Sequence, residues 1–260
     1  MAERDKRRVA RAFSRAAASY DTAARLQREI AHRLMNWLPE KNCTRLLDLS
    51  CGTGYAAPHL HSRYPEAALL QLDLAQGMLT FARAQRPVPG ALYLCGDAEQ
   101  LPLADASVDL IWSSLAVQWC ERPQRLLAEL ARVLRPGGRC LLATLGPDTL
   151  HELKQSWAAV DDDVHVNSFL PLARLLAHNR TLALVRQETE YRVLRYRRLQ
   201  QLMHELKTLG AHNVNRRRSQ GLSSRQRLLR LLEAYEAWRG DDGLLPATYE
   251  VYYLELYRKP

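Results

Sequence analysis

The chain has 260 residues, of which 47% are apolar and 25% are charged, with 12 glycines and 12 prolines. This composition is typical of a folded globular protein and excludes a collagen, a continuous coiled coil and a wholly disordered chain. Lysine and arginine number 37 against 28 acidic residues, a net charge of +9. That excess favours an acidic partner such as a nucleic acid, an anionic membrane or an acidic protein.

Cysteine usage and apolar segments bear on where the protein works. The five cysteines are scattered without a CxxC pair, so we expect neither a disulfide framework nor a zinc site, and a reducing cytoplasm is the simplest location. The first residues, MAERDKRRVARAF, lack the apolar core of a signal peptide. No apolar run reaches 18 residues, so we expect no membrane-spanning segment.

Helical and strand patterns alternate along the first 145 residues. An alanine-rich segment at 7–37 has the apolar spacing of a helix, and Ser19-Tyr20-Asp21-Thr22 predicts a break in it because such residues favour helix caps. The later predicted elements are strands at 45–49, 68–74, 91–95, 108–112 and 140–145, helices at 55–64, 76–85 and 123–134, and a turn at 135–138. This alternation predicts a parallel sheet with right-handed crossovers.

The pattern changes after residue 150. We expect a helix at 171–178, a long strand at 182–196, helices at 197–209 and 223–238, and a last strand at 249–258. Because two helices interrupt the last pair of strands, we expect them to form a cap over the edge of the sheet. The predicted fold class is therefore α/β, in a single domain over residues 1–260 whose parts are an N-terminal helical segment (1–40), a core (41–150) and a basic helical cap (197–240).

The first predicted strand runs into a turn of small residues, LDLSCGTG. Small residues let a ligand approach the backbone, and the helix that follows offers free N–H groups. A dinucleotide fingerprint would need glycine where Ser50 and Tyr55 stand, and the GK[ST] of a phosphate loop is absent. We therefore expect a ligand other than a dinucleotide or a nucleoside triphosphate.

A carboxylate stands at the carboxyl end of each of the first three predicted strands. Asp48 and Asp73 are suited to a ribose diol, which donates two hydrogen bonds, and Asp97 can accept one from the exocyclic amine of adenine. Acidic side chains repel phosphate, so the ligand is expected to be a nucleoside without phosphates. Three carboxylates at adjacent strand ends beside a glycine turn predict a cleft for S-adenosylmethionine.

Four segments carry a resemblance across residues 45–145. LLDLSCGTG, LLQLDLA, GDAEQLPL and LRPGGRCLLATL resemble, in order and spacing, the motifs of class I S-adenosylmethionine-dependent methyltransferases. The resemblance implies a Rossmann-like, mostly parallel seven-stranded sheet flanked by helices, with an N-terminal helical lid and a helical cap before the last strand. Ser50 stands where that family more often has glycine, so we expect a modest loss of cofactor affinity. The residues implied to bind the cofactor are Asp48, Ser50, Cys51, Gly52, Gly54, Asp73, Leu74, Met78, Asp97, Ala98, Ser114 and Leu115.

The stretch after the fourth strand, WSSLAVQWC, narrows the family. It lacks the Asn/Asp-Pro-Pro-Tyr/Phe clamp of amine-methylating enzymes. Together with FSRAAASYDTAARLQ, LGPDTLHELKQSWAAVDDDVHVNSFLP and LKTLGAHN, it is similar to the malonyl-acyl-carrier protein O-methyltransferases of biotin synthesis. That family is implied to methylate the free carboxylate of malonyl-acyl-carrier protein, and the ester then primes pimeloyl synthesis. The alternative is a carboxyl or other O-methyltransferase for a small metabolite.

This chemistry requires little from titrating side chains. A malonyl carboxylate, with a pKa near ~3–4, is ionised at pH 7 and needs no general base. Excluding water and aligning the two reactants should therefore supply most of the acceleration. The resemblance gives positioning roles to Tyr20, which closes over the methionine end of the cofactor, and to Gln118 and Trp119, which shape the acceptor pocket; core packing is the alternative for all three.

Two side chains near residue 165 are candidates for holding the acceptor carboxylate. His165 and Asn167 are expected there because a desolvated carboxylate needs a partner. Asp161-Asp162-Asp163 with His165 has the composition of a metal cluster. Consecutive carboxylates do not converge on one ion, so we expect a solvated acidic turn and no metal.

Positive charge is concentrated late in the chain. Residues 186–230 contain 12 lysines and arginines and three acidic residues, a difference of +9 that equals the whole excess of the protein. An acidic acyl-carrier protein is the expected partner, and a generic solvated surface or RNA binding is the alternative. The absence of aromatic–basic interleaving at 210–230 argues against nucleic acid. The residues expected to contact the carrier are Arg195, Lys207, Arg216, Arg217 and Arg218.

Overall fold

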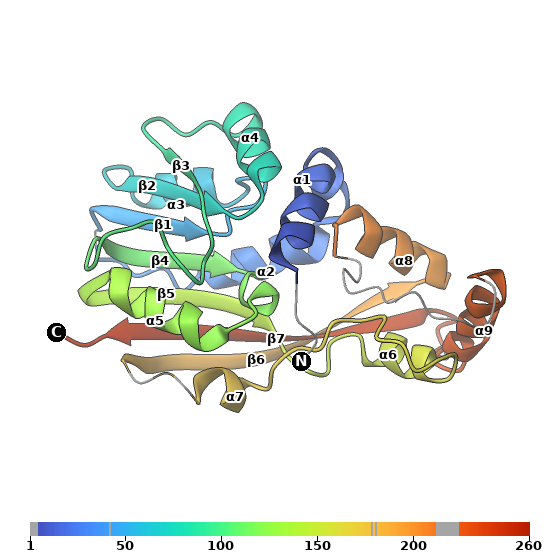
Figure 1. The fold of residues 1–260 in the computed structure, drawn as a ribbon. Helices are drawn as coiled ribbons and strands as arrows, with labels where there is room; N and C mark the ends of the chain where they lie inside the picture. The colour runs from blue at the N-terminus through green and yellow to red at the C-terminus, as the bar shows by residue number, and fades with distance from the viewer. Residues whose placement is uncertain (1–4, 42, 178, 180, 212–223) are drawn as a thin grey trace.

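A computed structural model of the chain describes residues 5–41, 43–177, 179, 181–211 and 224–260. It contains one seven-stranded sheet with the strand order β3-β2-β1-β4-β5-β7-β6 (Figure 1). The first five strands run parallel, and β7 lies antiparallel between β5 and β6. The strands are β1 Arg45–Leu49, β2 Ala68–Asp73, β3 Leu92–Cys95, β4 Val108–Ser114, β5 Leu134–Leu145, β6 Leu182–Tyr196 and β7 Leu245–Arg258.

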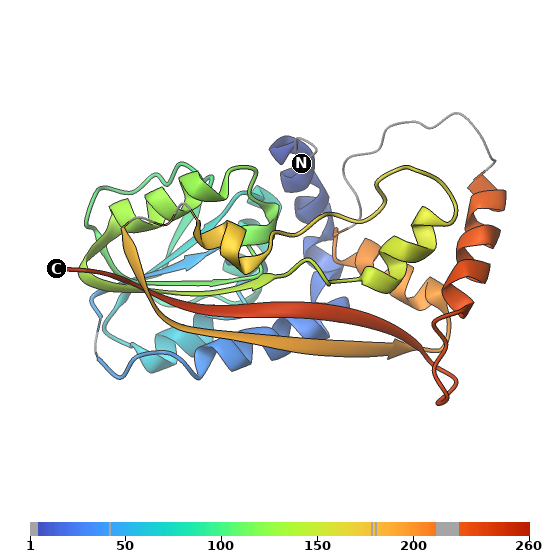
Figure 2. The ribbon, with the colours of Figure 1, turned by 90° about the horizontal axis from the view of Figure 1, so that it is seen from below.

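Helices cover both faces of the sheet (Figures 1 and 2). Side chains alternate between the faces along a strand. Leu46 and Leu110 therefore pack in the apolar layer of α2 and α3, whereas Leu47 and Ile111 pack in that of α5. None of the described helices is long and apolar enough to span a membrane. The helices are α1 Lys6–Ala23, α2 Arg25–Met35, α3 Ala57–Arg63, α4 Gln76–Gln85, the 3₁₀ helix η1 Val117–Trp119, α5 Pro123–Val133, α6 His151–Ala158, α7 Leu172–Leu176, α8 Leu199–Thr208 and α9 Ser224–Glu236.

The predicted alternation of strands and helices is confirmed, but the break in the first helical segment was misplaced. The helix continues through Ser19–Thr22 and breaks at Ala24. The hydroxyls of Ser19 and Thr22 donate to carbonyls one turn earlier instead of capping a new helix, at 3.2 and 2.6 Å. Asp21 accepts hydrogen bonds from Thr53 and Arg86, so a tertiary contact replaces the cap. Tyr20 therefore stays on the same helix as the N-terminal residues.

The turn predicted at 135–138 lies inside β5. Val108 of β4 is opposite Leu134, and Leu110 is opposite Arg139, so residues 135–138 bulge out of the strand beside one residue of β4. Gly137 supplies a φ of +81° in this bulge. The sequence also gave no indication of α6, which begins six residues after β5 ends.

Strands β6 and β7 form a long antiparallel pair that extends beyond the rest of the sheet (Figure 2), with α8 and α9 between them in the chain. The pairing of β5 with β7 ends at Val251, whereas β6 pairs with β7 as far as Leu245. Helices α6 and α9 pack on this extension through buried hydrogen bonds: the Glu152 carboxylate accepts from the Thr248 amide, at 3.1 Å, and the Tyr235 hydroxyl donates to a β7 carbonyl. The extension carries α8 to the side of α1, whereas α9 lies farther out and packs with α6 (Figure 1).

Candidate active site

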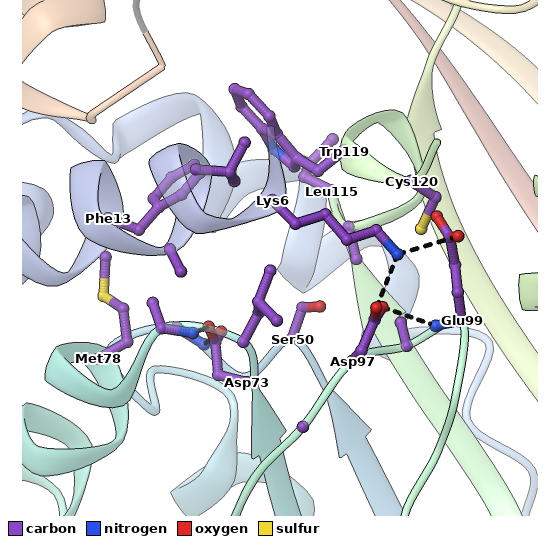
Figure 3. Close-up of a pocket in the computed structure, with 18 of the residues that line it drawn as sticks. Lys6, Phe13, Ser50, Asp73, Met78, Asp97, Glu99, Leu115, Trp119 and Cys120 are labelled. Carbon is purple, nitrogen blue, oxygen red and sulfur yellow. Dashed lines mark hydrogen bonds and ion pairs between the residues drawn. The ribbon is translucent and has the colours of Figure 1, made fainter. Parts of the chain in front are cut away.

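A pocket lies at the carboxyl ends of β1 to β4, and α1 forms one of its walls (Figure 3). Its empty volume is about 790 Å³ with the solvent in the open mouth included. The position agrees with the rule that open α/β sheets bind ligands beyond the carboxyl ends of their strands. The lining residues are Lys6, Val9, Ala10, Phe13, Tyr20, Ser50, Gly52, Asp73, Leu74, Ala75, Met78, Gly96, Asp97, Ala98, Glu99, Ser114, Leu115, Ala116, Trp119 and Cys120.

The turn after β1 forms the floor of the pocket with backbone in the left-handed region. Ser50, Gly52 and Gly54 have φ values of +58°, +55° and +74°. Ser50 therefore adopts the left-handed conformation that favours glycine, at the position where the resemblance implied one. Gly52 lines the pocket, and a Cβ added there would meet no atom within 4 Å. Gly54 faces the protein, where a Cβ would lie 2.8 Å from the Cβ of Ala82.

Asp73 fixes this turn against the next strand. Its Oδ2 accepts a hydrogen bond from the Gly52 amide, at 2.9 Å, and its Oδ1 accepts one from the Ala75 amide, at 2.7 Å. Burial raises the pKa of the Asp73 carboxyl, and hydrogen bonds from the backbone amides of Ala75, Gly52 and Leu74 oppose that rise. The carboxylate lines the pocket in a fixed orientation, with lone pairs left to accept from a diol.

Asp48 lies behind the turn and does not line the pocket. Its side chain is fully buried, and within the described residues neither of its oxygens has a hydrogen-bond partner. Gln71, the residue opposite it on β2, has an amide that is likewise unpartnered. Burial, followed by the charge of Asp73, raises the pKa of Asp48 to about 8. Asp48 is therefore protonated at neutral pH, and it is not among the residues that line the pocket.

We expect Asp48→Asn to flatten the pH dependence of stability. The unfolded chain ionises Asp48 above about pH 4, whereas the folded chain keeps the proton up to about pH 8, so stability falls as pH rises through this window. The variant loses this penalty. Its free energy of unfolding, measured in urea at pH 5, 6 and 7, should gain on that of the native protein by about 1.4 kcal/mol for each pH unit. Parallel curves for the two proteins would contradict the buried proton.

Lys6 closes the other end of the pocket (Figure 3). Its Nζ lies 2.7 Å from Oδ2 of Asp97 and 2.9 Å from Oε2 of Glu99. Burial opposes the charge of Lys6, but the hydrogen bonds and charges of the two carboxylates outweigh it and raise the pKa of the ammonium. Oδ1 of Asp97 accepts from the Glu99 amide. The carboxylate expected to face adenine is thus tied to the start of α1, a contact that the sequence did not indicate.

Aromatic side chains cover the centre of the pocket. The Phe13 ring meets the Trp119 ring edge-on, with centroids 5.0 Å apart, and lies 6.4 Å from the Tyr20 ring. Helix α1 is held over the pocket by Gly77 of α4, whose amide donates to the Ser14 hydroxyl at 3.1 Å. Burial, then the charges of Asp73 and Asp21, raises the pKa of Tyr20, so its hydroxyl stays protonated. Phe13 was part of the predicted apolar stripe but was not assigned to the site.

Several predicted residues lie elsewhere. Gln118 donates to the Leu115 carbonyl, at 2.7 Å, and lines a separate, smaller pocket with Thr144 and Phe169. Cys51 and Gly54 are buried beneath the turn and do not line the pocket.

The segment around residue 165 is also turned away from the pocket. His165 stacks on Trp157 at 3.5 Å, and its Nε2 lies 2.6 Å from Oδ1 of Asp161. Asn167 is half-buried and does not line the pocket. Ligand atoms of Asp161, Asp163 and His165 lie within 4.8 Å of one another, but Asp161 already accepts from His165 and from the Asp163 amide.

The positive charge of β6 is largely neutralised by ion pairs. Arg186 pairs with Glu188, Arg192 with Glu29 and Glu190, and Arg195 with Asp242. Lys207 is exposed on α8. Arg216, Arg217 and Arg218 lie outside the described residues.

Comparison with known proteins identifies the family. A model described as a methyltransferase domain matches residues 47–142. The malonyl-acyl-carrier protein O-methyltransferase of Laribacter hongkongensis is 44% identical over 272 residues, which cover 98% of this chain and 90% of that protein. The chain belongs to this family of methyltransferases. The resemblance to this family, predicted from the sequence motifs, is confirmed.

Two other matches compare the length and the fold of this methyltransferase with those of known proteins. The biotin biosynthesis bifunctional protein BioHC of Cellvibrio japonicus is 51% identical over 258 residues, which cover 97% of this chain and 50% of that protein, so the chain spans about half the length of this bifunctional relative. The crystal structure of a methyltransferase from Bacillus halodurans, at 17% identity, superposes with a TM-score of 0.65 over 89% of this chain and all of that one. This likeness confirms the predicted fold class.

The pocket of this methyltransferase fits S-adenosylmethionine. The open space beside Gly52 admits a ligand against the backbone, and Asp73 presents a carboxylate to it. Leu74, Met78, Ala98, Ser114 and Leu115, all assigned from the resemblance, line the same pocket. Apolar walls with a few convergent polar groups are what a nucleoside with an aliphatic tail requires.

Proposed function

We propose that the enzyme transfers a methyl group from S-adenosylmethionine to the free carboxylate of malonyl-acyl-carrier protein, giving the methyl ester that primes pimeloyl synthesis for biotin. The names of relatives that align along nearly the whole chain support this substrate. The observation in the structure that carries the proposal is a pocket without a general base. No histidine is among the described lining residues, and its titratable groups are Lys6, Tyr20, Asp73, Asp97, Glu99 and Cys120.

The lysine, the tyrosine and the three carboxylates that line the pocket are either held by partners or kept protonated. Asp73 accepts from two backbone amides, and Asp97 and Glu99 hold Lys6. Tyr20 is kept protonated by burial. Such a site cannot readily take a proton from a hydroxyl or an amine, but an acceptor that arrives as a carboxylate has no proton to lose.

The cofactor, when bound, supplies a methyl group made electrophilic by a sulfonium charge. In this proposal Gly52 and Asp73 hold the nucleoside, and the remaining lining residues exclude water from the reacting groups. Methyl transfer joins an anion to a cation, so charge disappears as the bond forms, and water would stabilise the reactants more than the transition state. The roof of Phe13, Tyr20 and Trp119 is therefore proposed to contribute by excluding solvent and by orienting the acceptor.

The N-terminal helices act, in the same proposal, as a lid. Helix α1 is attached to the core by side-chain contacts at its start and its middle, through Lys6 and Ser14. We propose that residues 1–40 move to admit the cofactor, with α8, which belongs to the predicted cap at 197–240, beside α1. The core at 41–150 supplies the strand ends.

We expect the rate at saturating substrates to be independent of pH between about 5.5 and 7, because the acceptor carboxylate is already ionised and no base titrates in that range. The measurement uses purified malonyl-acyl-carrier protein and cofactor labelled in the methyl group, with the label counted on the carrier. An unmodified carrier, with label on a small acid or phenol instead, would favour a small-molecule O-methyltransferase. A hydroxyl acceptor would also make the rate rise with pH.

A further inference from the structure

We infer that the outer face of α1 is the surface on which the acidic carrier domain docks. This inference rests on the proposed function and specifies where the partner binds. The sequence placed the carrier on the basic segment at 186–230. The distribution of ion pairs in the structure favours a different surface, formed by Arg7, Arg11 and Arg15 and called here the arginine stripe.

The arginine stripe follows from the helical repeat of α1. Its three residues are spaced by four and so lie along one face of the helix, and all three are exposed. Lys6 and Phe13 project from the opposite face into the pocket. The remaining sides of α1 are occupied by its neighbours α4 and α8 (Figure 1).

The contacts with α4 and α8 leave the arginine stripe on the free side of the helix. Ser14 accepts the Gly77 amide of α4, and Gly210, just after α8, lies against Ala12 and Ala16. One helix thus forms the wall of the pocket and presents positive charge to solvent.

The charge of the arginine stripe is not neutralised within the described residues. Arg7, Arg11 and Arg15 form no ion pair there, and the one hydrogen bond made by their guanidinium groups is from Arg11 to the Arg7 carbonyl. Residues 6–15 contain five basic and no acidic residues. By contrast, the arginines of β6 form ion pairs with Glu188, Glu190, Glu29 and Asp242, so most of their charge is neutralised within the protein.

Position and charge together suit an acidic partner that delivers a tethered group. An α-helix with its side chains is about 10–12 Å across, so a domain bound to the arginine stripe lies one helix diameter from the pocket. Exposed complementary charges speed and orient association without being buried in the interface. A small acidic helical carrier protein, with its malonyl group on a flexible arm, has these properties.

The test compares two substrates that share a reacting group. Wild-type enzyme and the variant Arg7→Glu/Arg11→Glu/Arg15→Glu are assayed with malonyl-acyl-carrier protein and with malonyl-pantetheine, which lacks the protein. We expect the variant to raise KM for the carrier at least tenfold at low salt. That difference should shrink as NaCl approaches 0.5 M, because exposed charges are then screened. kcat/KM for malonyl-pantetheine should stay within twofold.

A matched control reverses the same number of charges at the other end of the sheet. This control reverses the charges of Lys41, Arg45 and Arg63, which are exposed near the amino ends of the strands, away from the pocket. It should leave the KM for both substrates unchanged. If the Arg7→Glu/Arg11→Glu/Arg15→Glu variant fails to fold, the milder Arg7→Ala/Arg11→Ala/Arg15→Ala variant replaces it, with its fold checked by circular dichroism.

The outcomes separate this inference from the proposed function. If wild-type enzyme methylates neither thioester, the proposed function is wrong. If it methylates both and the arginine-stripe variants change neither KM, or change both equally, the docking surface is wrong. If carrier binding is lost only when Arg216, Arg217 and Arg218 are reversed, the carrier docks on the basic segment at 186–230, as the sequence predicted.

Discussion

Gly54→Ala is expected to destabilise the cofactor-free protein by about 2–5 kcal/mol. The left-handed backbone at φ +74° costs an L-residue about 1–2 kcal/mol. The new Cβ would also lie 2.8 Å from Cβ of Ala82 on α4 and 3.1 Å from Oε1 of Gln71 on β2, and such overpacking costs about 1–3 kcal/mol more. Urea unfolding without cofactor measures the loss.

Gly52→Ala is the matched control, two residues earlier in the same turn. Its φ of +55° carries a similar backbone cost, about 1–2 kcal/mol, but the added Cβ meets nothing within 4 Å. The variant should therefore be the more stable of the two. Its Cβ lies beside the pocket, however, so we expect binding of S-adenosylhomocysteine, measured by calorimetry, to weaken at least tenfold. Equal stability of the two variants would show that the two glycines do not have separate roles.

Asp73→Ala is expected to weaken cofactor binding by about 1.5–3 kcal/mol, which is roughly 10- to 150-fold in Kd. Two effects combine: the ribose loses its acceptor, and the amides of Gly52 and Ala75 lose theirs, so the turn is no longer fixed. Calorimetric titration with S-adenosylhomocysteine measures the change.

Asp73→Asn separates the two effects of this substitution. The amide keeps one oxygen to accept from the backbone but has no charge to offer a diol, so affinity should fall between those of the native protein and Asp73→Ala. Unchanged affinity in both variants would mean that the nucleoside does not lie against this carboxylate.

Much of the fold was predictable because its signals are local. Most of the parallel strands are short apolar runs followed by a helix with its own periodicity, so the number of strands and their places along the chain were predicted correctly. The parallel direction of the first five strands then fixes which ends share an edge. Gly52, Asp73 and Asp97 therefore reach one pocket although they are distant in the sequence.

Features that depend on contacts between distant segments were not predictable. The sequence could show that Asp48 ends a strand, but only packing determines that it is buried behind the turn rather than open to the pocket. Likewise, the sequence shows His165 only as a polar residue in a loop. Its contacts with the Trp157 ring and the Asp161 carboxylate appear only in the folded structure.

The sequence by itself determined the sheet, the glycine turn and the family, because hydrophobic periodicity and motif spacing are written within short segments of the chain. Only the tertiary structure decided which residues of α1 line the pocket and which arginines are left without an acidic partner among the described residues. Lys6 enters the site by pairing with Asp97 across 91 residues of chain, and Arg192 is neutralised by Glu29 across 163. Such pairs form when the fold brings distant side chains together, so local patterns carry no record of them.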